Sequence, residues 1–281
     1  MLSDFAAAWP LFHDAFLTGW LLAALLGLAG VLVVARDQIF IGAAVAQAST
    51  LGVAVAMCLA AAVGGHPWLE ADATLTALAV AAAVAAAVVT TRHPHDPGAP
   101  TPEALTGWVY LFAASAAILV VARSPHGLEE VHRLLSSSII GASPADVLLF
   151  AALLAAVATV VAGAHRPLLL LAVDPLMAAA VGVPVGRWNV LLSCSLGLLI
   201  GLAIPTAGVL YAFGCLVLPP LVARNLCREM RPMFVVAPLV ALGASVAAFV
   251  VAHHYDLPPA QATVALLCVL VGASSSLRRA G

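Results

Sequence analysis

The feature that most limits what this chain can fold into is a series of long apolar runs separated by short polar gaps. Spanning the ~30 Å hydrocarbon core of a bilayer as a helix takes roughly 20 apolar residues. Hydrophobic residues make up 64% of the chain and charged residues only 9%, whereas about a quarter of residues are charged in a soluble domain. We therefore expect an all-α polytopic membrane protein, because a membrane β-barrel would show short alternating strands instead.

The apolar runs predict about nine transmembrane helices in a single domain over residues 1–281. The sixth and seventh helices meet at Pro205, a residue type that interrupts helices, and together they are too long for one crossing. The first twenty residues carry no cation, so we expect no cleaved signal peptide. The predicted spans are 15–35, 41–63, 73–91, 104–122, 145–163, 188–204, 206–224, 233–252 and 259–276.

The eleven arginines, in a chain without lysine, divide unequally between the two sides of these helices. Only Arg123 and Arg133 fall on one side. By the positive-inside rule, this split places the N-terminus outside and the C-terminus in the cytoplasm. The net charge of −2 gives no reason to expect nucleic acid as a partner. The arginines of the inner side are Arg36, Arg92, Arg166, Arg187, Arg224, Arg228, Arg231, Arg278 and Arg279.

Six of the nine histidines and most carboxylates fall in the gaps of the predicted outer side. Short loops need polar residues in any case, so this distribution can be a matter of solubility alone. The alternative is an outer vestibule that receives a divalent cation, because imidazole and carboxylate oxygen suit such metals. Composition does not decide between the two.

The longest gap on the inner side carries the signals of a short helix over about 174–183. Asp174 is a good N-cap and Pro175 suits the first helical position, while Gly182 and Pro184 end the helix. Such a helix is too short to be stable alone in water, so it must dock against something. It can be an ordinary linker helix, or the helix by which the membrane subunit of an ATP-driven importer couples to its ATPase. The chain has no phosphate-binding loop, so any ATP hydrolysis belongs to a separate chain.

Gln47 is the most isolated polar side chain inside a predicted span. Ala43, Gln47 and Thr50 stand at i, i+4 and i+7, so they share one side of their helix. An amide at this depth needs a partner. That partner can be another helix, or the interior of a translocation path.

Pro219 and Pro220 stand together near the end of the span 206–224. Prolines interrupt the helical hydrogen-bond ladder, and membrane helices tolerate them where neighbours satisfy the freed carbonyls. The pair can form a hinge near a cytoplasmic gate or a purely structural bend.

Several separated segments resemble the membrane permeases of ABC transporters for zinc, manganese and iron, and the similarity extends over essentially the whole chain. Glu103 and Gly107 also fit the family. The segments are Asp174-Pro175 with Gly182-Val183-Pro184, the helix from Gly208-Val209-Leu210 through Pro219 to Arg224, Tyr255-Asp256-Leu257-Pro258-Pro259, and the frame from Gly42 to Gly52.

The resemblance implies an importer permease, not an enzyme, in a bacterial or archaeal plasma (inner) membrane. Two permease copies would assemble with two cytoplasmic ATP-binding-cassette ATPases, which bind the ATP, and an extracytoplasmic metal-binding protein would deliver the cargo. The chain itself would hold no cofactor. The family further implies coupling through the helix 174–183 and a translocation path lined partly by the second helix, operated by alternating access.

The second helix departs from the family where metal ligands are usual. Members typically carry Gly-Asp-Ala-x-Ser-His-Ala, whereas this chain has Ala43 in place of the Asp and Gln47 in place of the His. The change removes the charge and the imidazole that hold a transition metal. Either the metal passes with less coordination, helped by His253, His254 and Asp256 at the outer mouth, or the cargo differs.

Two other classes of transporter remain as alternatives. A siderophore or cobalamin permease would also carry a coupling helix, but such chains commonly run longer and have more spans. A secondary transporter driven by an ion gradient would be expected to show intramembrane carboxylates or broken helices at the midplane. An intramembrane hydrolase fits less well, because no Ser/His or His/Glu pair stands at catalytic spacing within a predicted span.

Overall fold

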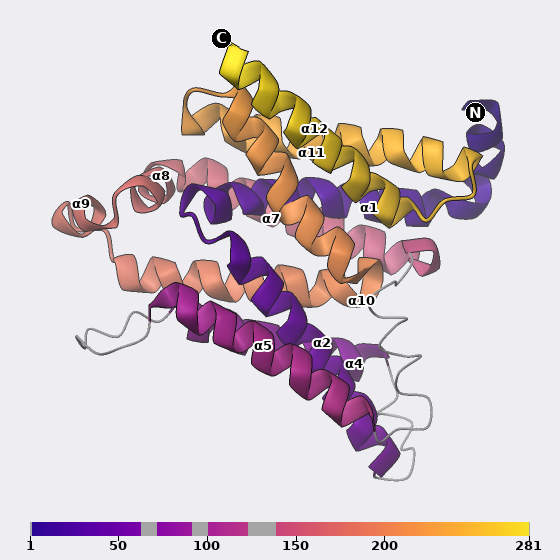
Figure 1. The fold of residues 1–281 in the computed structure, drawn as a ribbon, viewed down its shortest axis with the longest axis horizontal. Helices are drawn as coiled ribbons and strands as arrows, with labels where there is room; N and C mark the ends of the chain where they lie inside the picture. Colours follow the sequence, from indigo (N-terminus) through magenta and orange to yellow (C-terminus); the bar gives the residue numbers. More distant parts are fainter. Residues whose placement is uncertain (1, 63–71, 92–100, 123–138, 281) are drawn as a thin grey trace. The chain divides into compact units, whose positions relative to one another are not determined.

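The structure, a computed structural model, describes residues 2–62, 72–91, 101–122 and 139–280, and every regular element among them is helical (Figure 1). Eight of these helices are long and apolar enough to cross a membrane. The prediction of an all-α polytopic protein is thereby confirmed. The elements are α1 (Leu2–Ala35), α2 (Ile39–Ala62), α4 (Asp72–Thr91), α5 (Pro102–Val121), the 3₁₀ turn η1 (Ile139–Gly141), α7 (Pro144–Gly163), α8 (His165–Val173), α9 (Pro175–Ala180), α10 (Val185–Leu226), α11 (Met230–His254) and α12 (Pro259–Ala280).

Helix α10 is about twice as long as one crossing requires. Its 42 residues span roughly 63 Å at 1.5 Å per residue, against a ~30 Å hydrocarbon core. Gly208 inside it has a non-helical backbone, with φ 82° and ψ 163°, so α10 consists of two helices joined without a loop. Counting α10 as two crossings brings the described helices to the nine that the sequence predicts.

The break in α10 differs in position from the predicted one. The sequence places it at Pro205, whereas the structure keeps Pro205 helical and places the break at Gly208. A proline removes one hydrogen bond but can remain in a helix, while glycine adopts positive φ without the steric penalty that other residues incur. The first helix of α10 therefore ends, and the second begins, at position 208.

Two further elements differ from the predicted bounds. Helix α1 begins at Leu2 instead of residue 15, because hydropathy reports only the part of a helix that suits lipid, while backbone hydrogen bonding continues beyond it. The predicted inner connection between 163 and 188 holds α8 as well as the expected short helix. Helix α8 is only nine residues long, and its apolar part, 168–173, is shorter still, so it does not stand out as a span.

The helices pack into two compact units. Unit 1 comprises Met1–Asp37, Ser138–Val183 and Thr206–Gly281, and unit 2 comprises Gln38–Ser137 and Pro184–Pro205. Helix α10 contributes its first half to unit 2 and its second half to unit 1. The single domain expected over residues 1–281 stays a prediction.

In unit 2, α2 lies against α4 and α5 (Figure 1). Small residues let these backbones approach closely, and Val53 of α2 packs on Ala79 of α4 while Ala54 packs on Ala117 of α5. The Ser193 hydroxyl donates a hydrogen bond of 2.7 Å to the Thr91 hydroxyl. This bond ties the first half of α10 to α4.

In unit 1, a buried tyrosine joins three helices. The Tyr211 hydroxyl of α10 donates to the Gly19 carbonyl of α1 at 2.8 Å and lies 2.9 Å from the Ser245 hydroxyl of α11. Tyr211 and Ser245 are fully buried. Because no water competes in the apolar interior, these polar groups satisfy one another and fix the second half of α10 to its neighbours.

Helical dihedrals continue through Pro219 and Pro220, since Gly208 is the non-helical residue inside α10. Pro220 has no N–H to donate to the Leu216 carbonyl four residues earlier. Gly30 of α1 lies directly against that carbonyl, and a Cβ at position 30 would collide with it. The hydrogen that glycine carries in place of Cβ therefore points at the freed oxygen, a weak Cα–H···O contact. A hinge at the two prolines stays a prediction.

We predict that Gly30→Ala destabilises the protein by about 1–3 kcal/mol, because the new methyl group meets backbone that cannot move aside cheaply. Gly107→Ala is the matched control, since nothing lies within 4 Å of a Cβ at that exposed helical position. Alanine is favoured over glycine in a helix by about 1 kcal/mol, so the control should be neutral or stabilising. Thermal unfolding of the purified variants in detergent measures both, and equal stability of the two variants would contradict the contact.

Candidate functional site

Helix α9 is capped at both ends, as the sequence predicts. At its start the Asp174 carboxylate accepts a hydrogen bond of 2.9 Å from the Met177 N–H, and Pro175 occupies the first turn. At its end the Gly182 N–H donates to the Ala179 carbonyl at 3.1 Å and the Val183 N–H donates to the Ala178 carbonyl at 2.9 Å. This pairing is a Schellman motif, which requires the positive φ of 86° that Gly182 adopts. Pro184 follows and prevents the helix from continuing.

The apolar side chains of α9 and of the cap that follows it face outward. Leu176 is 85% exposed, Val181 60% and Met177 54%, whereas Ala178 is the buried residue of the helix. A six-residue helix that presents large apolar side chains in this way suits docking against another surface. Sequence reasoning predicted the helix and its caps, but not this exposure, which depends on the packing around it.

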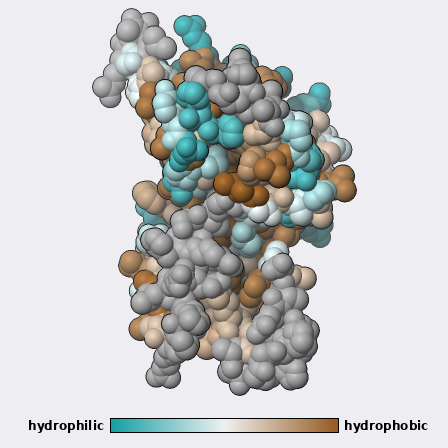
Figure 2. All heavy atoms as spheres, turned by 90° about the vertical axis from the view of Figure 1, so that its right-hand side faces the viewer, coloured by the Kyte–Doolittle hydropathy of each residue, from teal (hydrophilic) through white to brown (hydrophobic). Residues whose placement is uncertain are grey.

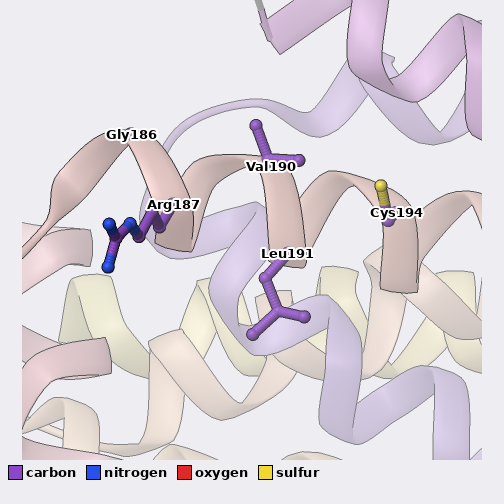
Figure 3. A pocket seen from close by; sticks show the side chains of 5 residues that line it. All are labelled: Gly186, Arg187, Val190, Leu191 and Cys194. Carbon is purple, nitrogen blue, oxygen red and sulfur yellow. The ribbon is translucent and has the colours of Figure 1, made fainter.

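A shallow hollow of about 520 Å³ lies on the first turns of α10, directly after the α9 segment in the sequence (Figure 3). Its lining comes from one helix, with exposed Val190, Leu191 and Arg187 beside Gly186 and Cys194. Sites that orient a small substrate combine an apolar wall with several converging polar groups. Arg187 is the one charged group here, so the hollow lacks that arrangement.

The path residues predicted on α2 do not share one environment. Ala43 and Gln47 are half-buried, and so is Leu51 one turn further on, so the three form a partly open stripe at helical spacing. Thr50 is only 2% exposed, and its hydroxyl donates to the Ala46 carbonyl at 3.1 Å. Gln47 is therefore the polar group of the stripe, while Thr50 lies behind it. A role for any of them in a path stays a prediction.

The three outer-mouth residues lie at the end of α11. The half-buried His253 ring packs edge-on against Phe5, with 5.9 Å between ring centroids, and His254 packs edge-on against Tyr255 at 4.9 Å. Asp256 is exposed and adopts a positive φ of 51° where the helix ends. Its carboxylate side chain is one of the few that tolerate this conformation.

These three side chains do not converge on one point. In the part of the chain that the structure describes, no group of three or more His, Cys, Asp or Glu side chains is placed to hold a metal ion. A contact of His253, His254 or Asp256 with a passing metal therefore stays a prediction. Several residues of the predicted polar gaps, including Arg92, Arg123 and Arg133, lie outside the described residues.

The same end of unit 1 gathers aromatic side chains. Phe5, Phe16 and Trp20 of α1 stack on one another, and Phe249 of α11 contacts Phe16 and Trp20. Phe16 and Phe249 are buried, so these rings are part of the packing between α1 and α11. Figure 2 views the molecule from the side where the N-terminus and the α11–α12 loop lie in Figure 1, and hydrophilic side chains gather there beside apolar ones.

The other end of the unit 1 helices gathers arginines. Arg224 at the end of α10 lies 3.4 Å from Asp37, which follows α1, and Arg231 stands in the first turn of α11. Burial lowers the pKa of the half-buried Arg36, although a guanidinium remains charged at physiological pH. The structure therefore brings together arginines that the sequence assigns to one side. Which side of the membrane they face stays a prediction.

Comparison with known proteins gives a consistent result. The model of the ABC 3 transport family matches residues 8–277. The chain is also similar to the chelated iron transport system membrane protein YfeD of Yersinia pestis, with 32% identity over 92 residues, which is 33% of this chain. In that match the chain spans 31% of the length of its relative.

Two solved structures have a similar fold. One is PsaBC from Streptococcus pneumoniae in complex with Fab, with a TM-score of 0.79, 19% identity, and coverage of 98% of this chain and 95% of that chain. The other is an inward-facing ABC transporter of a proposed metal-chelate type, with a TM-score of 0.73, 16% identity, and coverage of 97% and 89%.

Proposed function

Since this chain belongs to the ABC 3 transport family and is a multi-pass permease of the metal type, we propose that it imports zinc, manganese or iron ions across the plasma membrane. A separate cytoplasmic ATPase hydrolyses the ATP, a second permease copy completes the path, and an extracytoplasmic binding protein delivers the metal. The N-terminus lies outside and the C-terminus in the cytoplasm, in keeping with the end of unit 1 that carries the arginines.

The observation that carries this proposal is the exposed apolar face of α9. Asp174, Pro175, Gly182 and Pro184 give the helix fixed ends, so it holds its shape while Leu176 projects outward. A rigid element of this kind can insert into a cleft of the ATPase and transmit its movement. Because residues 181–184 join α9 directly to α10, a displacement of α9 pulls on the first half of that helix.

The translocation path includes the partly open stripe of α2. Gln47 offers an amide oxygen to the metal, Ala43 leaves room beside it, and Thr50 supports the helix from behind. Alternating access then opens the path beside the stripe first to the outside and then to the cytoplasm, with Pro219 and Pro220 as the hinge near the cytoplasmic gate. His253, His254 and Asp256 receive the metal at the outer mouth.

The alternative of a secondary transporter driven by an ion gradient has less support. Such proteins use helices broken near the bilayer midplane at their binding sites, whereas the break at Gly208 separates two crossings and therefore lies near a membrane boundary. The two candidates differ in their energy source, because only the importer depends on ATP and on contacts made by α9.

We predict that Leu176→Glu weakens binding of the partner ATPase by about tenfold or more. Docking would remove water from this side chain, and a carboxylate loses far more hydration energy than a leucine. Leu226→Glu is the matched control, since Leu226 is 55% exposed at the end of α10 and lies outside α9. Binding of the purified ATPase to each variant in detergent measures the effect, and thermal unfolding confirms that both are folded. Equal binding by the two variants would contradict docking through α9.

We further predict that the double substitution His253→Ala and His254→Ala lowers uptake severalfold at limiting metal, because two imidazole ligands are lost from the outer mouth. Gln261→Ala is the control, since it removes a polar side chain from the first turn of the following helix without removing an imidazole. Isotopic metal uptake by the assembled transporter is the measurement. Unchanged uptake by the double variant would reject the outer contact while leaving the role of α9 intact.

A further inference from the structure

An open groove of about 650 Å³ runs along unit 1, lined by α1, α7, α8 and α11. Its wall is apolar along most of its length and includes Leu28 of α1, Leu154 and Ala158 of α7, and Phe234 and Leu242 of α11. Nothing in the proposed transport cycle uses this groove. Its size lies within the range of binding sites for small molecules.

Two lining residues, His165 and Arg231, are polar, and Arg231 carries a positive charge. Both are exposed, and both stand at the end of the groove where α7 ends and α11 begins. The Nδ1 atom of His165 lies 2.9 Å from the Ala162 carbonyl. Since a carbonyl only accepts, Nδ1 carries the proton and the ring is held in place beside the groove.

The length of the groove matches one leaflet of a bilayer. Along α11 it runs from Arg231 to Leu242, a rise of roughly 16 Å at 1.5 Å per residue. The hydrocarbon core is ~30 Å thick, so the groove extends from the membrane boundary to about the midplane. The occupant that fits has an anionic group at the boundary and a hydrocarbon chain beneath it.

We propose that this groove binds one anionic phospholipid, with its phosphate on Arg231 and an acyl chain along Leu28, Leu154 and Leu242. A guanidinium forms paired hydrogen bonds with phosphate oxygens. Basic pockets between membrane helices are known to hold anionic headgroups. The charge at the mouth and the apolar wall below it thus match the two parts of one lipid molecule.

The charges favour a lipid over a second copy of the chain as the occupant. A second copy with the same orientation in the membrane would bring its own arginine-bearing end to the same depth, and like charges across an interface repel. Helix α7 also has no unsatisfied hydroxyl to offer a protein partner, because Thr159 donates to the Ala155 carbonyl of its own helix at 2.7 Å. An acyl chain, in contrast, needs no hydrogen-bonding group on the surface that it covers.

The first test measures headgroup binding by native mass spectrometry of the purified full chain, with phosphatidylglycerol as the anionic probe and phosphatidylcholine as the zwitterionic one. The wild type should retain one phosphatidylglycerol per chain in preference to phosphatidylcholine. Arg231→Gln should reduce this retention about fivefold, whereas the control Arg228→Gln, which removes an exposed arginine of the same segment from outside the groove, should not. Equal retention of the two lipids, or an equal loss of phosphatidylglycerol in the two variants, would contradict the proposed lipid site.

The second test blocks the acyl chain. Ala158→Trp fills the groove from an exposed position of α7, and Ala156→Trp adds the same bulk to an exposed position that does not line it. Ala158→Trp should lower phosphatidylglycerol retention while Ala156→Trp leaves it unchanged. Unaltered lipid retention in Ala158→Trp would overturn the proposal. If the wild type associates as two chains and this variant loses that association while keeping the lipid, the occupant of the groove is a second copy.

Discussion

The bilayer core contains no water to bond with a free backbone N–H or C=O group, and the structure is organised around that constraint. It explains why the described segments are helical and why polar groups near the interruptions of α10 find neighbours within the protein. Pro220 withholds a donor from the Leu216 carbonyl, and the Gly30 backbone of α1 fills the space beside it. Close to the break at Gly208, the Tyr211 hydroxyl donates a hydrogen bond to the Gly19 carbonyl of α1. These contacts fix the second half of α10 within unit 1.

What could be predicted from the sequence follows from how local the chemistry is. The caps of α9 depend on Asp174 and Gly182 alone, so a few adjacent residues suffice to predict them. The sequence predicts the break in α10 near the right place but at the wrong residue, because a proline can remain in a helix while Gly208 adopts a positive φ that other residues avoid. Which side chains are buried is harder to predict from the sequence. Helical spacing groups Thr50 with Gln47, whereas the packing of α2 against α4 and α5 buries Thr50 and leaves Gln47 half-exposed. Helix α8 and the exposure of the Leu176 side chain could not be predicted for the same reason.

Charge and aromatic side chains divide unit 1 into two ends, and the proposed functions follow that division. Arginines gather where α10 ends and α11 begins, and aromatic rings with His253 gather where α11 ends. In the proposed account the arginine end meets the ATPase through α9 and anionic lipid through the groove, while the opposite end receives the metal. The stripe on α2 carries an amide instead of charged ligands, and under the proposed function the choice of metal then depends on groups outside this stripe.

The proposed role as the permease of an ATP-driven importer is tested most directly by transport. The purified chain is reconstituted in vesicles with its ATPase and its metal-binding protein. Isotopic zinc, manganese and iron are offered in turn, with and without ATP, and in the presence or absence of an ion gradient. If the chain is the permease of an ATP-driven importer, at least one metal accumulates only when ATP and the ATPase are both present. Accumulation by the permease alone, driven by an ion gradient without ATP, would contradict it.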